Sequence, residues 1–192
     1  MIHRVSGTLF AKKPNFLVLE TSGGVSLRIF ASPHTLSLLP VAGSPITVFT
    51  HLHVREDALE LYGFSAESEL SLFEKLISVS GIGPKSAMGI LGVSKPDQLV
   101  AAINEGRTEL ITRASGVGKK TAERVVLELK GKLAGVGSAE ALASMESDVE
   151  LEETLVSLGY SHAQAKIALE KVGPKVTGFK ERLREALKGV KS

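Results

Sequence analysis

One short pattern occurs twice in this chain, and each copy forces a tight turn followed by a helix. The copies are Ser80-Gly81-Ile82-Gly83-Pro84-Lys85-Ser86-Ala87 and Ser115-Gly116-Val117-Gly118-Lys119-Lys120-Thr121-Ala122. Only glycine adopts positive φ without a steric cost and lets the backbone approach a ligand closely. A helix that starts directly after such a turn presents unpaired backbone N–H groups. The duplication therefore predicts two helical hairpins of one design.

The residues around each turn favour phosphate as the ligand. A helix N-terminus carries partial positive charge, and its free N–H groups bind anions. Lysines follow the glycines in both copies, and residues 112–132 are rich in Lys and Arg. For a single copy, a plain helix–helix turn with solvated lysines would be an equal alternative, but two copies in register favour a phosphate clamp. Its predicted residues are Gly81, Gly83, Lys85, Gly116, Gly118, Lys119, Lys120, Thr121 and Arg124.

Neither copy fits a nucleotide-binding loop. A Walker loop needs GxxxxGK[ST], whereas Pro84 follows Gly83 in the first copy and Lys120 stands at the hydroxyl position in the second. The dinucleotide fingerprint GxGxxG also fails, because both copies lack its third glycine. We therefore expect no nucleotide cofactor.

Composition narrows the remaining classes. The chain has no cysteine, which excludes disulfides, Cys-ligated zinc and thiol catalysis. His51 and His53 share one face of a predicted strand, but no third ligand accompanies them, so we expect structural roles and no metal. The formal net charge is only +2, so nucleic-acid contacts must be local. Neither a signal peptide nor a membrane span is apparent, which predicts a soluble, cytoplasmic protein without a membrane partner.

Residues 1–64 have the alternating pattern of short strands separated by Pro, Gly, Ser and Asn turns. The expected strands are residues 5–10, 16–21, 25–30, 46–53 and 59–62. Five strands in so short a segment predict an OB-type Greek-key barrel. Residues 33–39 would supply a short helix between its third and fourth strands.

From Ser65 onward the periodicity is helical. Residues 65–133 hold both glycine turns and predict a tandem helix-hairpin-helix domain. Residues 134–147 are small and polar, which predicts a flexible linker. Residues 148–192 predict a three-helix (UBA-like) module, too small for a large core and suited to partner binding. The fold class is therefore α+β and multidomain.

Several local sequences strengthen one family resemblance. They are Met-Ile at the start with Gly7, Val-Phe-Thr-His at 48–51, Val-Arg-Glu-Asp at 54–57, Leu-Tyr-Gly-Phe at 61–64 and Gly-Lys-Lys-Thr-Ala-Glu-Arg at 118–124. Together with the order of the domains, they resemble the RuvA family of Holliday-junction branch-migration subunits over essentially the whole chain. Glycine hairpins alone would indicate only a helix-hairpin-helix protein, a class that includes nucleases, ligases and glycosylases.

The resemblance implies a specific role for the loop Arg55-Glu56-Asp57. From the residues alone, a charged turn between two apolar strands indicates only a surface loop. The resemblance implies that Glu56 and Asp57 form an acidic pin at the centre of a four-fold assembly, near the junction crossover. Carboxylates there would repel phosphates and guide separated strands. Arg55 would hold a backbone phosphate or pair with its acidic neighbours.

The resemblance also implies the partners. These are four-way junction DNA, further copies of the chain in a homotetramer, the hexameric RuvB ATPase and the RuvC resolvase. Whether one tetramer or two stacked tetramers bind the junction stays open. The chain would be a non-catalytic subunit that works in recombination, DNA repair and the SOS response, with the motor on RuvB. Leu155, Leu158, Tyr160 and Leu187 are candidate partner contacts, and the module's own core is the alternative for each.

Three other classes of protein stay open at this point. They are a generic helix-hairpin-helix DNA-binding protein, a structure-specific nuclease and a single-strand binder. A structure-specific nuclease needs a carboxylate cluster for Mg²⁺, but Glu56 and Asp57 on a strand would point to opposite faces. A single-strand binder needs stacking aromatics, and these make up only 5% of the chain. No base-reading residues are apparent, so we expect recognition of DNA shape rather than sequence.

Overall fold

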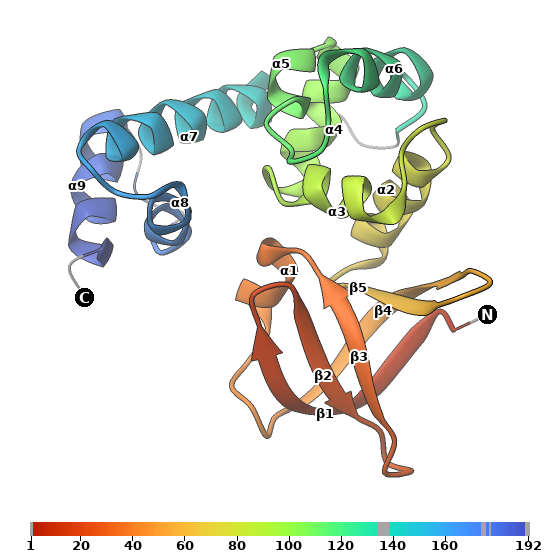
Figure 1. Ribbon diagram of the computed structural model, residues 1–192. Coiled ribbons are helices and arrows are strands. Elements are labelled where there is room, and N and C mark those ends of the chain that lie inside the picture. The colour runs from red at the N-terminus through yellow and green to blue at the C-terminus, as the bar shows by residue number, and fades with distance from the viewer. Residues whose placement is uncertain (1, 134–138, 174–175, 177, 191–192) are drawn as a thin grey trace. The chain divides into compact units, whose positions relative to one another are not determined.

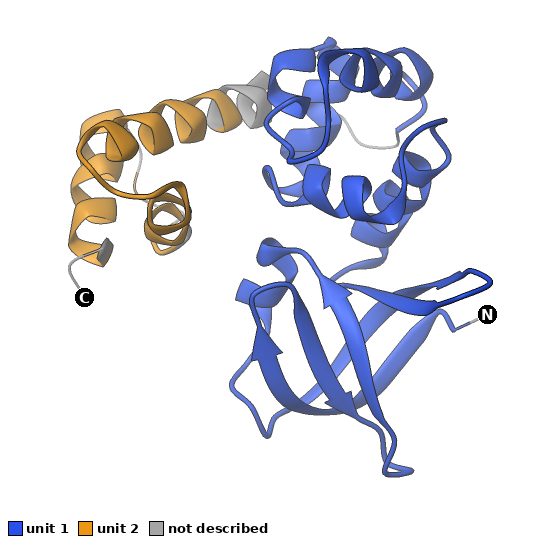
Figure 2. Cartoon of the chain, in the orientation of Figure 1, with its two compact units in different colours: residues 1–137 blue, residues 138–192 orange. Residues whose placement is uncertain are grey.

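The computed structural model describes residues 2–133, 139–173, 176 and 178–190. They form two compact units, residues 1–137 and residues 138–192, which Figure 2 colours separately. The first unit holds a β-barrel followed by short helices, and the second is helical in its described part (Figure 1).

Five strands close into a barrel in the order β1-β2-β3-β5-β4. They are β1 (Arg4–Lys13), β2 (Phe16–Glu20), β3 (Ser26–Ala31), β4 (Pro45–Val54) and β5 (Leu59–Phe64). The β3–β5 pair is parallel and the other pairs are antiparallel. Alternate residues point inward, so that Leu17, Leu19 and Ile29 are fully buried in the core. The predicted five-stranded OB-type barrel is confirmed.

Four helices complete the first unit after α2 (Glu67–Ile77). They are α3 (Pro84–Leu91), α4 (Pro96–Glu105), α5 (Thr108–Ile111) and α6 (Lys119–Leu129). Leu76, Leu99 and Ile103 are fully buried. One glycine turn joins α2 to α3 and the other joins α5 to α6, which confirms the predicted tandem helix-hairpin-helix domain.

A buried carboxylate fastens the barrel to these helices. Glu69 of α2 is only 1% exposed. It accepts hydrogen bonds from the hydroxyls of Ser32 and Thr35, at the start of the short barrel helix α1 (Pro33–Leu38). The backbone N–H and hydroxyl of Ser65 donate to it as well. Because these donors come from both sides of the joint, Glu69 fixes α2 against the barrel.

Aromatic packing holds the same helix against β4 and β5. The Phe73 ring stacks on Tyr62, with centroids 5.4 Å apart, and packs against Phe64 at 4.9 Å. Burial raises the pKa of Tyr62 far above its usual range, and a hydrogen bond to the Glu60 carboxylate raises it further. The Tyr62 hydroxyl therefore stays neutral. His51 of β4 also contacts Phe73 and lies 3.2 Å from the Glu74 carboxylate.

The second unit contains α7 (Ala139–Ser157), α8 (His162–Glu170) and α9 (Phe179–Val190). Its core is small and includes the fully buried Leu155, Ala165 and Ala186. Helix α8 begins with a capping box, in which Ser161 and Gln164 satisfy each other's backbone N–H groups. The three helical stretches expected from the sequence are thus present.

Helix α7 begins earlier than the sequence analysis expects. Residues 134–147 are predicted to be a flexible linker, but α7 starts at Ala139. Helix propensity gives the reason, because residues 139–147 are mostly Ala, Glu, Leu and Met, which form helices readily. Residues 134–138 lie outside the described residues.

Candidate nucleic-acid interface

The two glycine turns have the same structure, position by position. The N–H of Ile82 donates to the carbonyl of Val79 in the first turn, and the N–H of Val117 donates to the carbonyl of Ala114 in the second. All four of these side chains are buried. An apolar pair therefore anchors each turn in the domain core and leaves the glycines at the surface.

Each turn depends on one glycine with a left-handed backbone. The φ angle is +86° at Gly81 and +79° at Gly116, a region that strains any residue with a Cβ. Two residues later, Gly83 and Gly118 are extended and become the N-caps of α3 and α6. A glycine cap has no side-chain oxygen, so it leaves the N–H groups of the first helical turn open to another acceptor. All four glycines are exposed.

Basic side chains surround both helix starts. Lys85, Lys119 and Lys120 are exposed, and Thr121 is half-buried. The helix dipole adds partial positive charge at the same places. The first helix start has one donor fewer, because Pro84 carries no N–H. The second turn is therefore the candidate anion site that is richer in backbone donors.

Arg124 connects the two turns. It projects from α6, behind the second turn, and its Nη1 donates to the carbonyl of Ser80 in the first turn at 2.9 Å. A Cβ added at Gly81 would lie 3.3 Å from the same nitrogen. The sequence groups Arg124 with the second turn, but the structure brings its charge to the first, where Pro84 removes a donor.

One carboxylate lies beside the second turn. Glu109 lines the same pocket as Gly118 and Lys119. Its partner is Arg107, whose Nε donates to Glu109 Oε1 at 2.5 Å. The Arg107 guanidinium, followed by a backbone hydrogen bond, holds the pKa of that carboxyl below its usual range. Arg107 offsets the negative charge that would otherwise repel a phosphate here.

The acidic loop is a tight turn at the end of the β4–β5 hairpin. The N–H of Arg55 donates to the carbonyl of Ala58 at 2.8 Å. Glu56 and Asp57 occupy the two positions between them, and both are exposed. They lie in a loop between two strands, as the sequence predicted, because β4 ends at Val54 and β5 begins at Leu59. The argument that two adjacent carboxylates on a strand point to opposite faces therefore does not apply to them.

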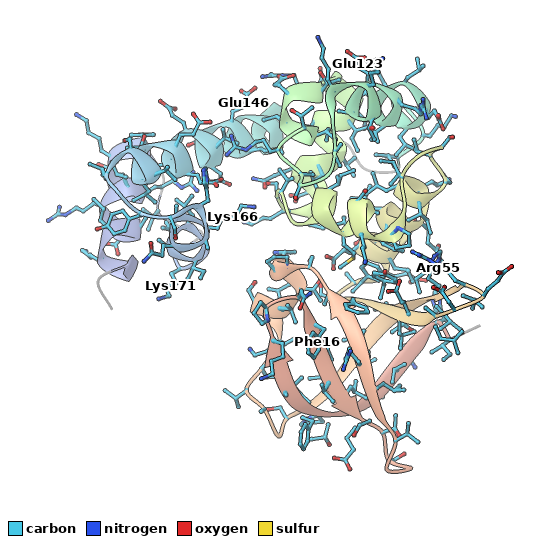
Figure 3. All side chains as sticks on the ribbon, viewed as in Figure 1. Phe16, Arg55, Glu123, Glu146, Lys166 and Lys171 are labelled. Atoms are coloured by element: carbon cyan, nitrogen blue, oxygen red, sulfur yellow. The ribbon has the colours of Figure 1, made fainter. Side chains whose placement is uncertain are left out.

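Arg55 makes a contact that the sequence does not indicate. Its Nε donates to Nε2 of His53 at 3.1 Å. Figure 3 labels the Arg55 side chain beside the β4–β5 hairpin. Among the described residues, no ion pair joins Arg55 to Glu56 or Asp57. Arg55 therefore does not pair with its acidic neighbours in this structure, and its other suggested role, holding a backbone phosphate, stays a prediction.

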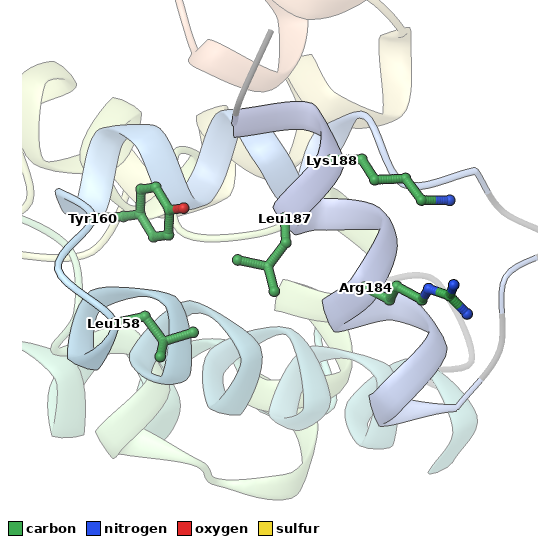
Figure 4. Close-up of a pocket in the computed structure, with 5 residues that line it drawn as sticks. All are labelled: Leu158, Tyr160, Arg184, Leu187 and Lys188. Carbon is green, nitrogen blue, oxygen red and sulfur yellow. The ribbon is translucent and has the colours of Figure 1, made fainter.

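The candidate partner residues divide into two groups. Leu155 is fully buried in the core of the second unit, so it cannot contact a partner, and we remove it from the candidates. Figure 4 shows side chains of the other three pointing toward a common hollow, with two basic residues on α9 beside it. The pocket is lined by Leu158, Tyr160, Arg184, Leu187 and Lys188. Leu158 is 57% exposed, so its side chain is accessible to a partner.

Within the described residues, no three His, Asp or Glu side chains are grouped so as to hold a metal ion. None of the described helices is long and apolar enough to cross a membrane.

Comparison with known proteins agrees with this geometry. Residues 1–63 match the family model described as RuvA N terminal domain, and residues 73–132 match the SAM-like Helix-hairpin-helix tandem. A curated protein of Chloroflexus aggregans, named Holliday junction branch migration complex subunit RuvA, is 45% identical, with 98% of this chain and 97% of that protein covered. The chain belongs to the RuvA family. Proteins of the same name from Dehalococcoides mccartyi and Bordetella petrii are 42% and 41% identical, over 90% and 99% of this chain and 89% and 99% of their own.

The two family matches together cover both parts of the candidate interface. The acidic loop lies inside the barrel match, and both glycine turns lie inside the helix-hairpin-helix match. Two features of this RuvA chain have no local sequence signal, namely the bond from Arg124 to Ser80 and the bond from Arg55 to His53. A glycine pattern can be read locally, whereas the partner of a long cationic side chain depends on the folded arrangement.

Proposed function

We propose that this protein is the non-catalytic, junction-binding subunit of a Holliday junction branch migration complex. It binds four-way DNA junctions, holds them open and planar, and recruits the RuvB ATPase, in recombination, DNA repair and the SOS response in the cytoplasm. The observation that carries the proposal is the pair of matched glycine turns with open helix N-termini and exposed lysines. The names of the RuvA relatives support it.

The turns act as a clamp on the DNA backbone. Backbone N–H groups of α3 and α6 donate to phosphate oxygens, and Lys85, Lys119 and Lys120 add charge. Arg124 holds the first turn in place and contributes its remaining donors. Because phosphates are the same in every sequence, such a clamp positions a duplex without reading its bases.

Specificity for a junction comes from assembly. We propose a homotetramer in which each protomer grips one arm, so that simultaneous engagement multiplies modest single affinities. The exposed carboxylates of Glu56 and Asp57 then face the crossover as a pin. Their charge disfavours a closed duplex there and directs the separated strands into neighbouring arms.

The second unit supplies the contact with the motor. The pocket of Leu158, Tyr160 and Leu187 is the candidate surface for RuvB, since it combines apolar side chains with the basic Arg184 and Lys188 and lies outside the DNA-binding domain. The RuvC resolvase joins the larger complex through contacts that we do not assign to residues.

A reconstitution tests this function. The purified chain, RuvB and ATP are mixed with a labelled synthetic four-way junction, and separated duplex products are followed on a gel. We expect products only when both proteins and ATP are present, and a particle mass of four or eight protomers for the chain by light scattering. Cut strands after incubation of the chain alone with Mg²⁺ would instead indicate a nuclease.

A further inference from the structure

We infer that His53 is a positioning residue of the acidic pin. It holds the Arg55 guanidinium at the base of the pin, where it can take a DNA phosphate, and keeps it away from the carboxylates of Glu56 and Asp57 at the tip. The inference rests on the proposed function, because it assumes that the pin meets a junction. It assigns a role to a histidine for which the sequence indicates nothing beyond a structural position.

The contact has a defined chemistry. A guanidinium can only donate hydrogen bonds, so Nε2 of His53 must be the acceptor in the 3.1 Å contact with Arg55 Nε. An imidazole accepts only through a nitrogen without a proton. The His53 ring is therefore neutral in this arrangement, and it binds the cation through a lone pair rather than through opposite charge.

The strand geometry places this contact on one side of the hairpin. His51 and His53 are two residues apart on β4, so their side chains share a face. His51 packs against Phe73 and lies beside Glu74, both in α2. The face that carries His53 and Arg55 is thus the face on which the helical domain sits, and the glycine turns belong to that domain.

His53 is the acceptor of the Arg55 Nε hydrogen, although a carboxylate lies nearby on β5. Glu60 lies directly opposite His53 in the strand register and accepts the hydroxyl of Tyr62 at 2.8 Å. Burial and Glu60 raise the pKa of Tyr62, and the positive charge of Arg55 partly opposes them by lowering it. Arg55 therefore lies close enough to Tyr62 to interact with it electrostatically. The guanidinium is therefore directed back toward the barrel strands.

The consequence is a separation of charge along the pin. Without its acceptor, Arg55 is free to swing toward the exposed carboxylates beside it, because a surface ion pair is weakly favourable and no hydrogen bond to His53 then competes with it. That swing would offset the charge at the tip and remove the cation from the base. His53 keeps both charges available to the junction.

Five proteins test the role: wild type, His53→Gln, His53→Leu, Arg55→Ala, and His53→Leu combined with Arg55→Ala. Fluorescence anisotropy at fixed salt gives the Kd of each for a four-way junction and for linear duplex of matched sequence. We expect His53→Leu to weaken junction binding about three- to tenfold, the range of one hydrogen bond, and to leave duplex binding unchanged. Unchanged duplex binding also shows that the variant is folded.

The other variants decide between a positioning role and a structural one. His53→Gln keeps an oxygen that can accept from Arg55 and should stay within about twofold of wild type. In the Arg55→Ala background, His53→Leu should have no further effect, because it acts through Arg55. The inference is overturned if His53→Leu matches wild type, if His53→Gln fails to rescue, or if the loss persists without Arg55. Absence of any junction preference in wild type overturns the proposed function, and this inference with it.

Discussion

At the scale of the residue, the two glycines of each turn have different tasks. Gly81 and Gly116 supply a backbone conformation, with φ near +80° in both turns. Gly83 and Gly118 have ordinary extended angles, and nothing lies within 4 Å of a Cβ built on either. The fold therefore does not require glycine at the second pair, and we propose that close approach of a phosphate does.

Gly118→Ala should separate these two tasks. We expect stability close to wild type, because the methyl group meets open space, but roughly tenfold weaker junction binding, because it stands where a phosphate must approach. Gly116→Ala is the control, and it should lower the free energy of unfolding by about 1–2 kcal/mol because of its left-handed φ. Urea denaturation and gel shift measure the two effects. Unaltered DNA affinity in Gly118→Ala would speak against the clamp.

Lys119→Ala combined with Lys120→Ala should reduce the salt dependence of DNA binding. Each phosphate contact contributes about 0.9 to the slope of log K against log salt, so the slope should fall by up to about two. The matched control removes two exposed lysines elsewhere, with Lys13→Ala and Lys180→Ala, and should keep the wild-type slope. A slope that stays the same in the Lys119 and Lys120 variant would mean that the clamp is misplaced.

At the scale of the element, the strands and turns could be predicted from the sequence because their signals are local. Alternation identified every barrel strand, and the glycines identified both turns. The Arg124 bond to Ser80 spans 44 residues and depends on how two hairpins meet. The burial of Glu69 could not be predicted from the sequence either, because a glutamate in the first turn of a helix normally faces solvent.

The joint between the barrel and α2 should be sensitive to this one carboxylate. Glu69→Leu leaves the hydroxyls of Ser32 and Thr35 and the N–H of Ser65 without their acceptor, and we expect a loss of about 3 kcal/mol in the free energy of unfolding. Glu67→Gln, in the same helical turn but exposed, should change it by less than about 0.5 kcal/mol. Equal urea midpoints for the two variants would contradict the structural role of Glu69.

At the scale of the whole molecule, we propose that the chain separates DNA binding, in the first unit, from partner binding, in the second. Each of the two compact units has its own core. The sequence predicted a third, partner-binding part, but not where it begins, because residues 139–147 have helix propensity without the sustained apolar stripe that marks a packed helix. Burial also decided among the candidate contacts, since no sequence pattern distinguished Leu155 from Leu158.

Leu158→Asp should therefore uncouple the two functions. Leu158 is exposed, so the fold and the junction affinity should be unchanged, while RuvB-driven branch migration should fall at least about tenfold, as expected for a contact at the centre of an interface. Ile167→Asp places the same charge at another exposed apolar site, outside the pocket, and should behave as wild type. Equal migration rates for both variants would exclude this pocket as the RuvB surface.

The proposed function depends on preference for a four-way junction, which a competition gel shift measures. Labelled junction is bound at fixed, near-physiological salt and challenged with unlabelled junction, linear duplex or single strand of matched sequence. The account predicts that only the unlabelled junction competes efficiently, and that Glu56→Gln with Asp57→Asn keeps binding but lets duplex compete better. Equal competition by all three DNAs against the wild-type protein would contradict the account and leave a generic helix-hairpin-helix DNA-binding protein.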